Sequence, residues 1–142
     1  GALVFTARKT GMASTCPDVK ATLTRSAQLA EYWTNLNEHI QSIEHTHLNE
    51  SAAIYGSGLY GAYIASILLA PERIVCFLDA SPYRQGKHLF GKPIMAPNQL
   101  PESVRVLYIG LNPSIARNVI AQLDWALERG LEVVYLGNIS DA

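Results

Sequence analysis

The short segment 55–61, with the sequence YGSGLYG, carries the residue types best suited to binding chemistry. Gly56, Gly58 and Gly61 have the spacing G-x-G-x-x-G, between an apolar run and a run with a helical pattern. In that setting the first glycine allows a tight turn, the second lets backbone approach a phosphate, and the third lets helix pack on strand. The amino end of the helix adds free N–H groups and a positive dipole end. The segment 56–61, here called the glycine turn, predicts a phosphate-bearing ligand, unless the glycines serve strand–helix packing alone.

An acidic residue ends the next apolar run, RIVCFLD, at Asp79. An acid at this place commonly accepts hydrogen bonds from ribose hydroxyls in dinucleotide-binding folds. Asp before Ser81 and Pro82 is equally typical of a residue that initiates a turn. Both interpretations of Asp79 stay open at the level of sequence.

A polar loop follows Asp79 and contains Tyr83, Arg84, Gln85 and Lys87. We expect this loop to lie over a crevice that the glycine turn lines. Arg and Lys pair well with a diphosphate, although a solvated loop has the same composition. Asn112 is a further candidate, but its place before Pro113 favours the N-cap of the next helix. The candidate ligand-binding residues are Tyr55, Gly56, Ser57, Gly58, Leu59, Tyr60, Gly61, Asp79, Tyr83, Lys87 and Asn112.

The histidines around residue 45 do not form a metal site by spacing. His45 and His47 are two residues apart and do not share a helix face, and no Cys or acid completes a set with His39 and Glu44. This cluster indicates a polar helix end. No Ser/His/Asp arrangement is evident either, so the sequence predicts a binding domain, with its catalytic residues unassigned.

The elements that must hold these residues alternate along the chain. Apolar, strand-like runs cover about residues 2–7, 52–55, 73–79, 104–110 and 131–137, and a short strand with one helical turn is expected within 94–101. Helical patterns cover about residues 18–48, in one piece or two, and then 61–69 and 112–130. The apolar face of the first helix is expected to hold Val19, Leu23, Leu29, Trp33, Leu36, Ile40 and Ile43, and its polar face Glu31, Asn35, Glu38 and Gln41.

Strands that are apolar throughout, alternating with helices, are typical of a parallel sheet covered on both faces. We expect a Rossmann-like, three-layer α/β fold with a mostly parallel sheet and a long amino-terminal helix. Right-handed crossovers place strand 52–55 in the middle, between strands 73–79 and 104–110. The glycine turn then lies at the switch point of the sheet, where ligands of open α/β sheets bind.

Composition excludes several classes of partner. The net charge is −1 and no basic stripe is present, which disfavours nucleic acid. No apolar run reaches membrane-spanning length. Cys76 lies inside an apolar run and Cys16 in a turn-like segment, a pattern that favours free thiols and a cytoplasmic location. The opening GALVFTARK looks like a buried strand already under way, so we expect a fragment of a longer protein.

The run 52–100 resembles the carboxyl-terminal domain of S-adenosylmethionine-dependent C-methyltransferases that act on nucleotide-linked deoxysugars. The resemblance implies that residues 1–48 are the end of the methyltransferase domain and a linker helix, and that residues 49–142 are a Rossmann-like domain for the nucleotide-sugar. It also implies that S-adenosylmethionine and the catalytic Tyr/His pair belong to the upstream part, so this fragment needs no cofactor and does not catalyse methyl transfer alone. A homo-oligomer stays open. The matching residues are Tyr55, Gly56, Gly61, Asp79, Pro82, Gln85, Gly86, Leu89, Gly91, Ile94, Pro97 and Leu100.

The chain departs from that family at two places beside the expected crevice. Leu59 and Tyr60 stand where the family often has Lys, and Leu111 precedes Asn112 where the family often has Trp. The sugar or the nucleotide is therefore expected to differ. Nucleotide-sugar epimerase- or dehydratase-like proteins and some sugar acyltransferases share much of the pattern. An NAD-binding oxidoreductase fragment is a third interpretation, disfavoured because no second catalytic group of residues follows.

Overall fold

The computed structural model describes residues 19–137, so the strand expected over residues 2–7 and the segment with Cys16 lie outside the described part. Two short 3-10 helices, Pro71–Arg73 and Pro97–Gln99, precede β2 and β5. The other elements, in chain order, are α1 (Val19–Thr46), β1 (Ser51–Tyr55), α2 (Leu59–Ile67), β2 (Ile74–Leu78), β3 (His88–Leu89), β4 (Lys92–Met95), β5 (Val104–Ile109), α3 (Pro113–Ile120), α4 (Asp124–Glu128) and β6 (Glu132–Tyr135).

The six strands form one sheet in the order β3-β4-β2-β1-β5-β6. Neighbouring strands run parallel except for β3 and β4, which form an antiparallel hairpin. The predicted central place of β1, with β2 on one side and β5 on the other, is confirmed. The prediction of a Rossmann-like, mostly parallel α/β fold with a long amino-terminal helix is confirmed as well.

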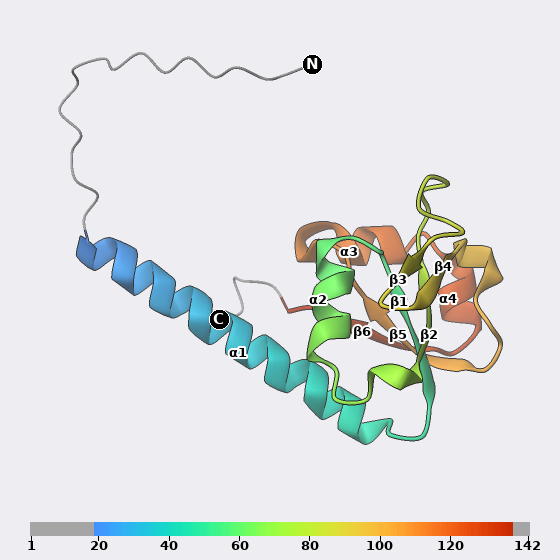
Figure 1. Ribbon diagram of the computed structural model, residues 1–142, viewed down its shortest axis with the longest axis horizontal. Helices are drawn as coiled ribbons and strands as arrows, with labels where there is room; N and C mark the ends of the chain where they lie inside the picture. The colour runs from blue at the N-terminus through green and yellow to red at the C-terminus, as the bar shows by residue number, and fades with distance from the viewer. Residues whose placement is uncertain (1–18, 138–142) are drawn as a thin grey trace, which may run out of the picture.

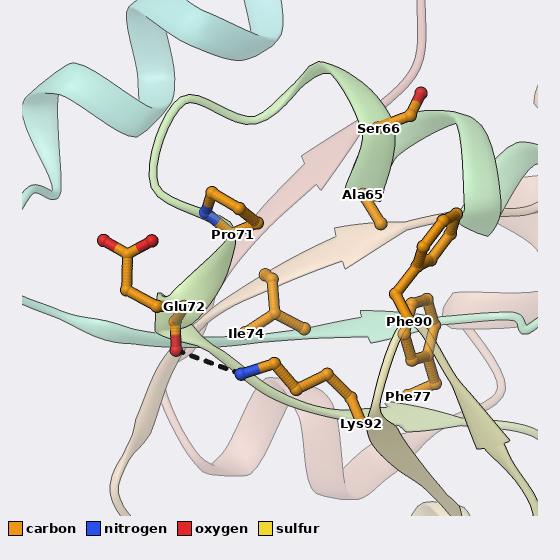
Figure 2. Close-up of a pocket in the computed structure, with 8 residues that line it drawn as sticks. All are labelled: Ala65, Ser66, Pro71, Glu72, Ile74, Phe77, Phe90 and Lys92. Atoms are coloured by element: carbon orange, nitrogen blue, oxygen red, sulfur yellow. Dashed lines mark hydrogen bonds between the residues drawn. The ribbon is translucent and has the colours of Figure 1, made fainter.

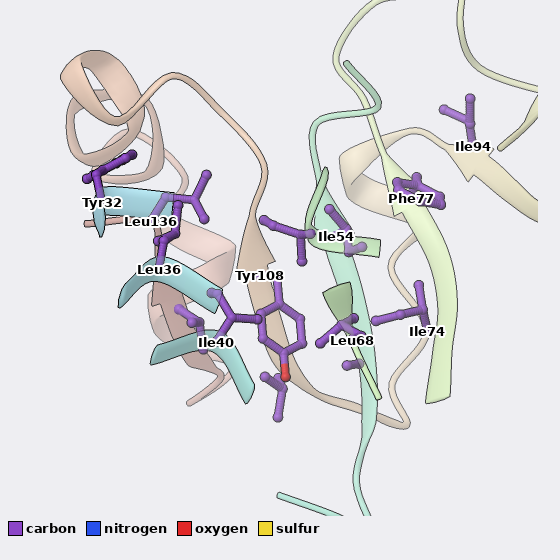
Figure 3. Packing of buried hydrophobic residues seen from close by; sticks show 14 residues of the cluster. Tyr32, Leu36, Ile40, Ile54, Leu68, Ile74, Phe77, Ile94, Tyr108 and Leu136 are labelled. Carbon is purple, nitrogen blue, oxygen red and sulfur yellow. The ribbon is translucent and has the colours of Figure 1, made fainter. Parts of the chain in front are cut away.

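Helices cover both faces of the sheet and give the molecule three layers (Figure 1). Successive β1 residues serve opposite faces: Ile54 packs in the cluster beneath α1 and α2, and Ala53 packs in the cluster beneath α3. Figure 3 shows the first cluster, in which Ile40 of α1 and Tyr108 of β5 meet. Because both faces of the central strands are covered, these strands are apolar apart from Ser51 and Arg105 near their amino ends, as the sequence predicted.

The long helix is continuous, but only its second half packs on the domain. Its buried residues recur every fourth position and are Tyr32, Leu36, Ile40 and Glu44. The prediction that Trp33 lies on the buried face is wrong, because the packed stripe passes through Tyr32 and Trp33 instead meets the Tyr63 ring edge-on at 4.7 Å. All residues from 19 to 31 are exposed, and this half of α1 projects away from the domain (Figure 1).

The carboxyl end of α1 is anchored by Glu44, whose side chain is buried. Its two carboxylate oxygens accept hydrogen bonds from the N–H groups of Leu69 and Ala70, each at 2.8 Å, just after α2. Arg73 donates to the main-chain carbonyls of Glu44, His47 and Glu50. These contacts give the polar residues at the end of α1 a structural role. Among residues 19–137, no three or more potential metal ligands lie together.

Two predicted elements differ in the structure. The segment after β2, expected as a loop, contains the β3–β4 hairpin, whose two-residue turn is Phe90 and Gly91. The single helix expected over 112–130 is broken into α3 and α4, and the break buries Ala126 while Leu127 stays exposed. Across residues 19–137 no helix combines the length and the apolar character needed to cross a bilayer.

Candidate functional site

The glycine turn lies where β1 ends, at the point where the chain changes from one face of the sheet to the other. β1 leads into α2 and β5 leads into α3, on opposite faces. The ladder of the sheet continues up to this edge, since Gly56 N donates to Leu78 O at 2.7 Å and Gly110 N donates to Tyr55 O at 2.8 Å. This is the switch point that the sequence predicted, and ligands of such sheets bind there.

Two of the three glycines are required by packing. Gly56 has φ +99°, which favours glycine, and a Cβ atom on it would lie 2.5 Å from the carbonyl oxygen of Gly110. A Cβ on Gly61 would overlap with the carbonyl oxygen of Gly56, and one on Gly110 would lie 2.5 Å from the Cα of Gly61. The turn, the first turn of α2 and the end of β5 therefore meet backbone to backbone. Gly110 is not recognisable from the sequence as part of this site, because its signal is only its place at the end of a strand.

Gly58 is different, because packing does not explain it. Its φ of −88° and ψ of −159° are open to any residue. Among residues 19–137, a Cβ on Gly58 would meet a single neighbour within 4 Å, the Nη1 atom of Arg84, at 3.6 Å. The backbone at Gly58 thus lacks a side chain although neither its conformation nor its packing requires glycine.

Asp79 closes the glycine turn. Its Oδ2 accepts hydrogen bonds from the Ser57 hydroxyl and, at 3.1 Å, from the Ser57 N–H, and its Oδ1 accepts from Ser81 N at 2.9 Å. The bond to Ser81 makes Asp79 a turn-initiating residue, one of the two interpretations that the sequence left open. Burial alone would raise the pKa of Asp79, but the hydrogen bonds from Ser57 and Ser81 and the charge of Arg84 outweigh it, so the pKa lies below its ordinary value.

Arg84 reaches over the turn from the polar loop. Its Nη1 donates to Ser57 Oγ at 3.3 Å and lies 3.8 Å from Asp79 Oδ2, while about half of the side chain is exposed. Gln85 fixes the loop by donating to the main-chain oxygen of Asp79 at 2.8 Å. The sequence indicates Arg84 only as a partner for a diphosphate, and the structure places it in contact with the glycine turn.

The remaining candidates lie at different depths. Tyr55 is buried in the cluster beneath α3, and burial, followed by the charge of Asp79, raises its pKa. Tyr60 packs against the cluster beneath α2, whereas Leu59 is exposed. Asn112 is the N-cap of α3, since its side chain accepts hydrogen bonds from Ser114 N and Oγ.

Tyr83 and Lys87 are exposed in the polar loop. Within residues 19–137 neither side chain makes a hydrogen bond or an ion pair to the glycine turn, so their part in a site stays a prediction.

The amino end of α2 completes the site. No side chain caps it, and the first intrahelical bond runs from Ala62 N to Gly58 O at 2.9 Å. The N–H groups of residues 59–61 therefore have no acceptor within the helix, and the positive end of the helix dipole lies beside the Arg84 guanidinium. Bare backbone, free N–H groups and a cation at one edge of the sheet suit an anionic ligand.

No family model matches the chain, and no curated protein matches it. Among solved structures it is similar to UDP-D-quinovosamine 4-dehydrogenase from Vibrio fischeri, with 19% identity and a TM-score of 0.49 over 65% of this chain and 81% of that one. It is also similar to RSP, a Rex-family repressor, with 14% identity and a TM-score of 0.49 over 65% of this chain and 54% of that one, about half its length. Both similarities are too distant to bear on ligand or activity, and the Rossmann-like assignment rests on the strand order and the glycine turn.

Proposed function

We propose that the chain binds the phosphate-bearing part of a nucleotide-linked ligand at the glycine turn. The observation that carries the proposal is Gly58, where neither backbone conformation nor packing requires glycine. A phosphate placed against this bare backbone would accept hydrogen bonds from the first turn of α2 and from Arg84. The same phosphate would be blocked by a side chain at Gly58.

Asp79 contributes to the proposed site in two ways. Its Oδ2 holds Ser57 and so fixes the turn, while its Oδ1 accepts a single bond from Ser81 and has a lone pair left for a ribose hydroxyl. The hydrogen bonds from Ser57 and Ser81 and the charge of Arg84 lower the pKa of Asp79, which means that they favour its charged form. A phosphate beside the Asp79 carboxylate would be a second negative charge. Arg84 and the amino end of α2 supply positive charge that offsets the repulsion between the two.

For the whole protein, we propose a substrate-binding role in a methyltransferase that uses S-adenosylmethionine, with a nucleotide-sugar as the ligand. The resemblance of residues 52–100 supports this. The methyl donor would bind outside residues 49–142.

Titration with three ligands separates the candidate functions. If the site takes a nucleotide-sugar, UDP should raise the melting temperature by mass action, and NAD and S-adenosylmethionine should not. Stabilisation by NAD at a lower concentration than by UDP would instead favour an oxidoreductase or a dehydratase-like protein. Calorimetric binding of S-adenosylmethionine at the glycine turn would contradict the substrate role. If neither UDP nor NAD binds at millimolar concentration, the proposed site in this chain is wrong.

A further inference from the structure

A cavity lies away from the glycine turn, beside β2. It has a volume of about 300 Å³ and is lined by residues of α2, the 3-10 helix before β2, β2 itself and the β3–β4 hairpin (Figure 2). The lining residues are Ala65, Ser66, Pro71, Glu72, Ile74, Phe77, Phe90 and Lys92. This volume is at the lower end of the range for ligand pockets, and about twice that of an apolar cavity known to hold benzene.

The cavity exists because one crossover has no helix. Parallel neighbours such as β2 and β4 are usually joined through a helix that covers the sheet. Here the described connection between them holds only β3 and turns, so α2 has no neighbouring helix on that side. The face of β2 that bears Ile74 and Phe77 is packed instead by Ala65 of α2 and Leu89 of the hairpin. Ile74 and Phe77 form a nearly inaccessible floor of the cavity, and Phe90 lines it from the hairpin turn.

Phe90 is placed there against its local preference. It has φ +50° and Gly91 has φ +73°, the conformation of a type I′ hairpin turn, which favours Asn, Asp or Gly at the first position. An aromatic residue in this conformation carries strain, and 62% of its surface is exposed. A ligand that packs against the Phe90 ring would explain why this residue keeps a strained backbone and an exposed ring beside the cavity.

Lys92 gives the cavity its charge preference. Its Nζ makes one hydrogen bond, of 3.3 Å, to the main-chain oxygen of Glu72, and an ammonium group has two further donors. The Glu72 carboxylate points away from the cavity in Figure 2. Ser66 is already satisfied, since its hydroxyl donates to Tyr63 O at 2.7 Å. The cavity thus offers two aromatic rings, aliphatic walls and one cation at its mouth.

We propose that this cavity is a second ligand site, for a small molecule with an aromatic ring and a carboxylate. The ring lies against Phe90, Ala65 and Pro71, where aromatic contacts and apolar burial hold it. The carboxylate pairs with Lys92. This site is independent of the glycine turn, and neither proposal depends on the other.

The test uses the full chain with 3-phenylpropanoate and its neutral amide as probes, followed by NMR signals of the methyl groups of Ala65 and Ile74. Both probes should shift these signals, and the carboxylate should bind about three- to fivefold tighter, as expected for a solvent-screened ion pair. Lys92→Gln should lower carboxylate affinity to that of the amide and leave amide affinity unchanged. Lys20→Gln, the same change on the projecting half of α1, should alter neither.

Phe90→Asn separates a ligand role from a packing role. Asn suits the turn, so the variant should keep or raise the melting temperature while it weakens both probes. Equal affinity of the wild-type chain for both probes, full affinity in Phe90→Asn, or no shift at millimolar concentration would each overturn the proposal. NMR signals of Ala65 and Ile74 that shift with protein concentration, without any probe, would also overturn the proposal. Such shifts would mean that a second copy of the chain covers the cavity.

Discussion

Replacing Gly58 and Gly61 one at a time separates the effect of the glycine turn on packing from its effect on ligand binding. Gly58→Val adds a Cβ whose contact within 4 Å, among residues 19–137, is Arg84 Nη1 at 3.6 Å, in an extended backbone conformation. The loss of stability should stay near that of a poorer N-cap residue, about 0.5–1 kcal/mol. Gly61→Ala should gain about 1 kcal/mol of stability from helix propensity. Its Cβ would force the backbone at Gly56 away, however, so the net loss in the free energy of unfolding should be about 2–4 kcal/mol.

Thermal melts and titration with UDP measure the two effects. For a chain of this size 1 kcal/mol corresponds to about 3–5 °C in melting temperature, so Gly58→Val should lose less than about 5 °C and Gly61→Ala about 6 °C or more. Gly58→Val should bind UDP at least about tenfold more weakly, a loss of about 1.4 kcal/mol or more. Gly137→Val is the control, since among residues 19–137 its Cβ meets nothing within 4 Å and its φ is not in the left-handed region. Undiminished UDP affinity in Gly58→Val would refute the reasoning, and so would a large loss of stability in that variant.

Three further predictions follow from single side chains. Arg84→Gln should weaken UDP about three- to tenfold with little change in melting temperature, whereas Arg105→Gln at the amino end of β5 should change neither. Glu44→Gln should cost about 1–3 kcal/mol in chemical denaturation, because an amide has one oxygen for two N–H donors, while the half-exposed Glu50→Gln should cost less than about 0.5 kcal/mol. Burial raises the pKa of the Cys76 thiol to about 11, so peptide mapping should find it unmodified by thiol reagents until the chain unfolds. Because the folded thiol holds its proton longer than the unfolded one, the thiol's contribution to stability should be complete below about pH 9 and be lost as the pH rises toward 11.

The sequence predicted the sheet well because its strands carry their signal locally. The strand 52–55 is apolar at nearly every position, and the glycine turn after it marks a strand–helix junction, so its central place followed from right-handed crossovers. Asn112 was equally local, since an N-cap followed by Pro needs no tertiary information.

Features that depend on packing between distant segments were not predictable in the same way. The buried stripe of α1 passes through Tyr32 because it meets β5 and the end of β6, and no spacing in the helix distinguishes Tyr32 from Trp33. The break between α3 and α4 likewise goes with the burial of Ala126, which the spacing of apolar residues did not indicate. Gly110 entered the site through contacts with Gly56 and Gly61, some fifty residues earlier in the chain.

The electrostatics of the site explain how it can be stable without a ligand and still receive one. Hydrogen bonds from Ser57 and Ser81 hold the Asp79 carboxylate in place, and the Arg84 guanidinium and the amino end of α2 supply positive charge beside it. The 3.8 Å approach of Arg84 to Asp79 in a half-exposed position is a weak, solvent-screened pair, so the guanidinium can turn at little cost. Turning the guanidinium from Ser57 Oγ toward a phosphate at Gly58 would exchange one long hydrogen bond of 3.3 Å for charge-assisted bonds. The arrangement thus favours an anion over a neutral ligand at the glycine turn, and it makes Arg84 the side chain whose movement a bound ligand should reveal first.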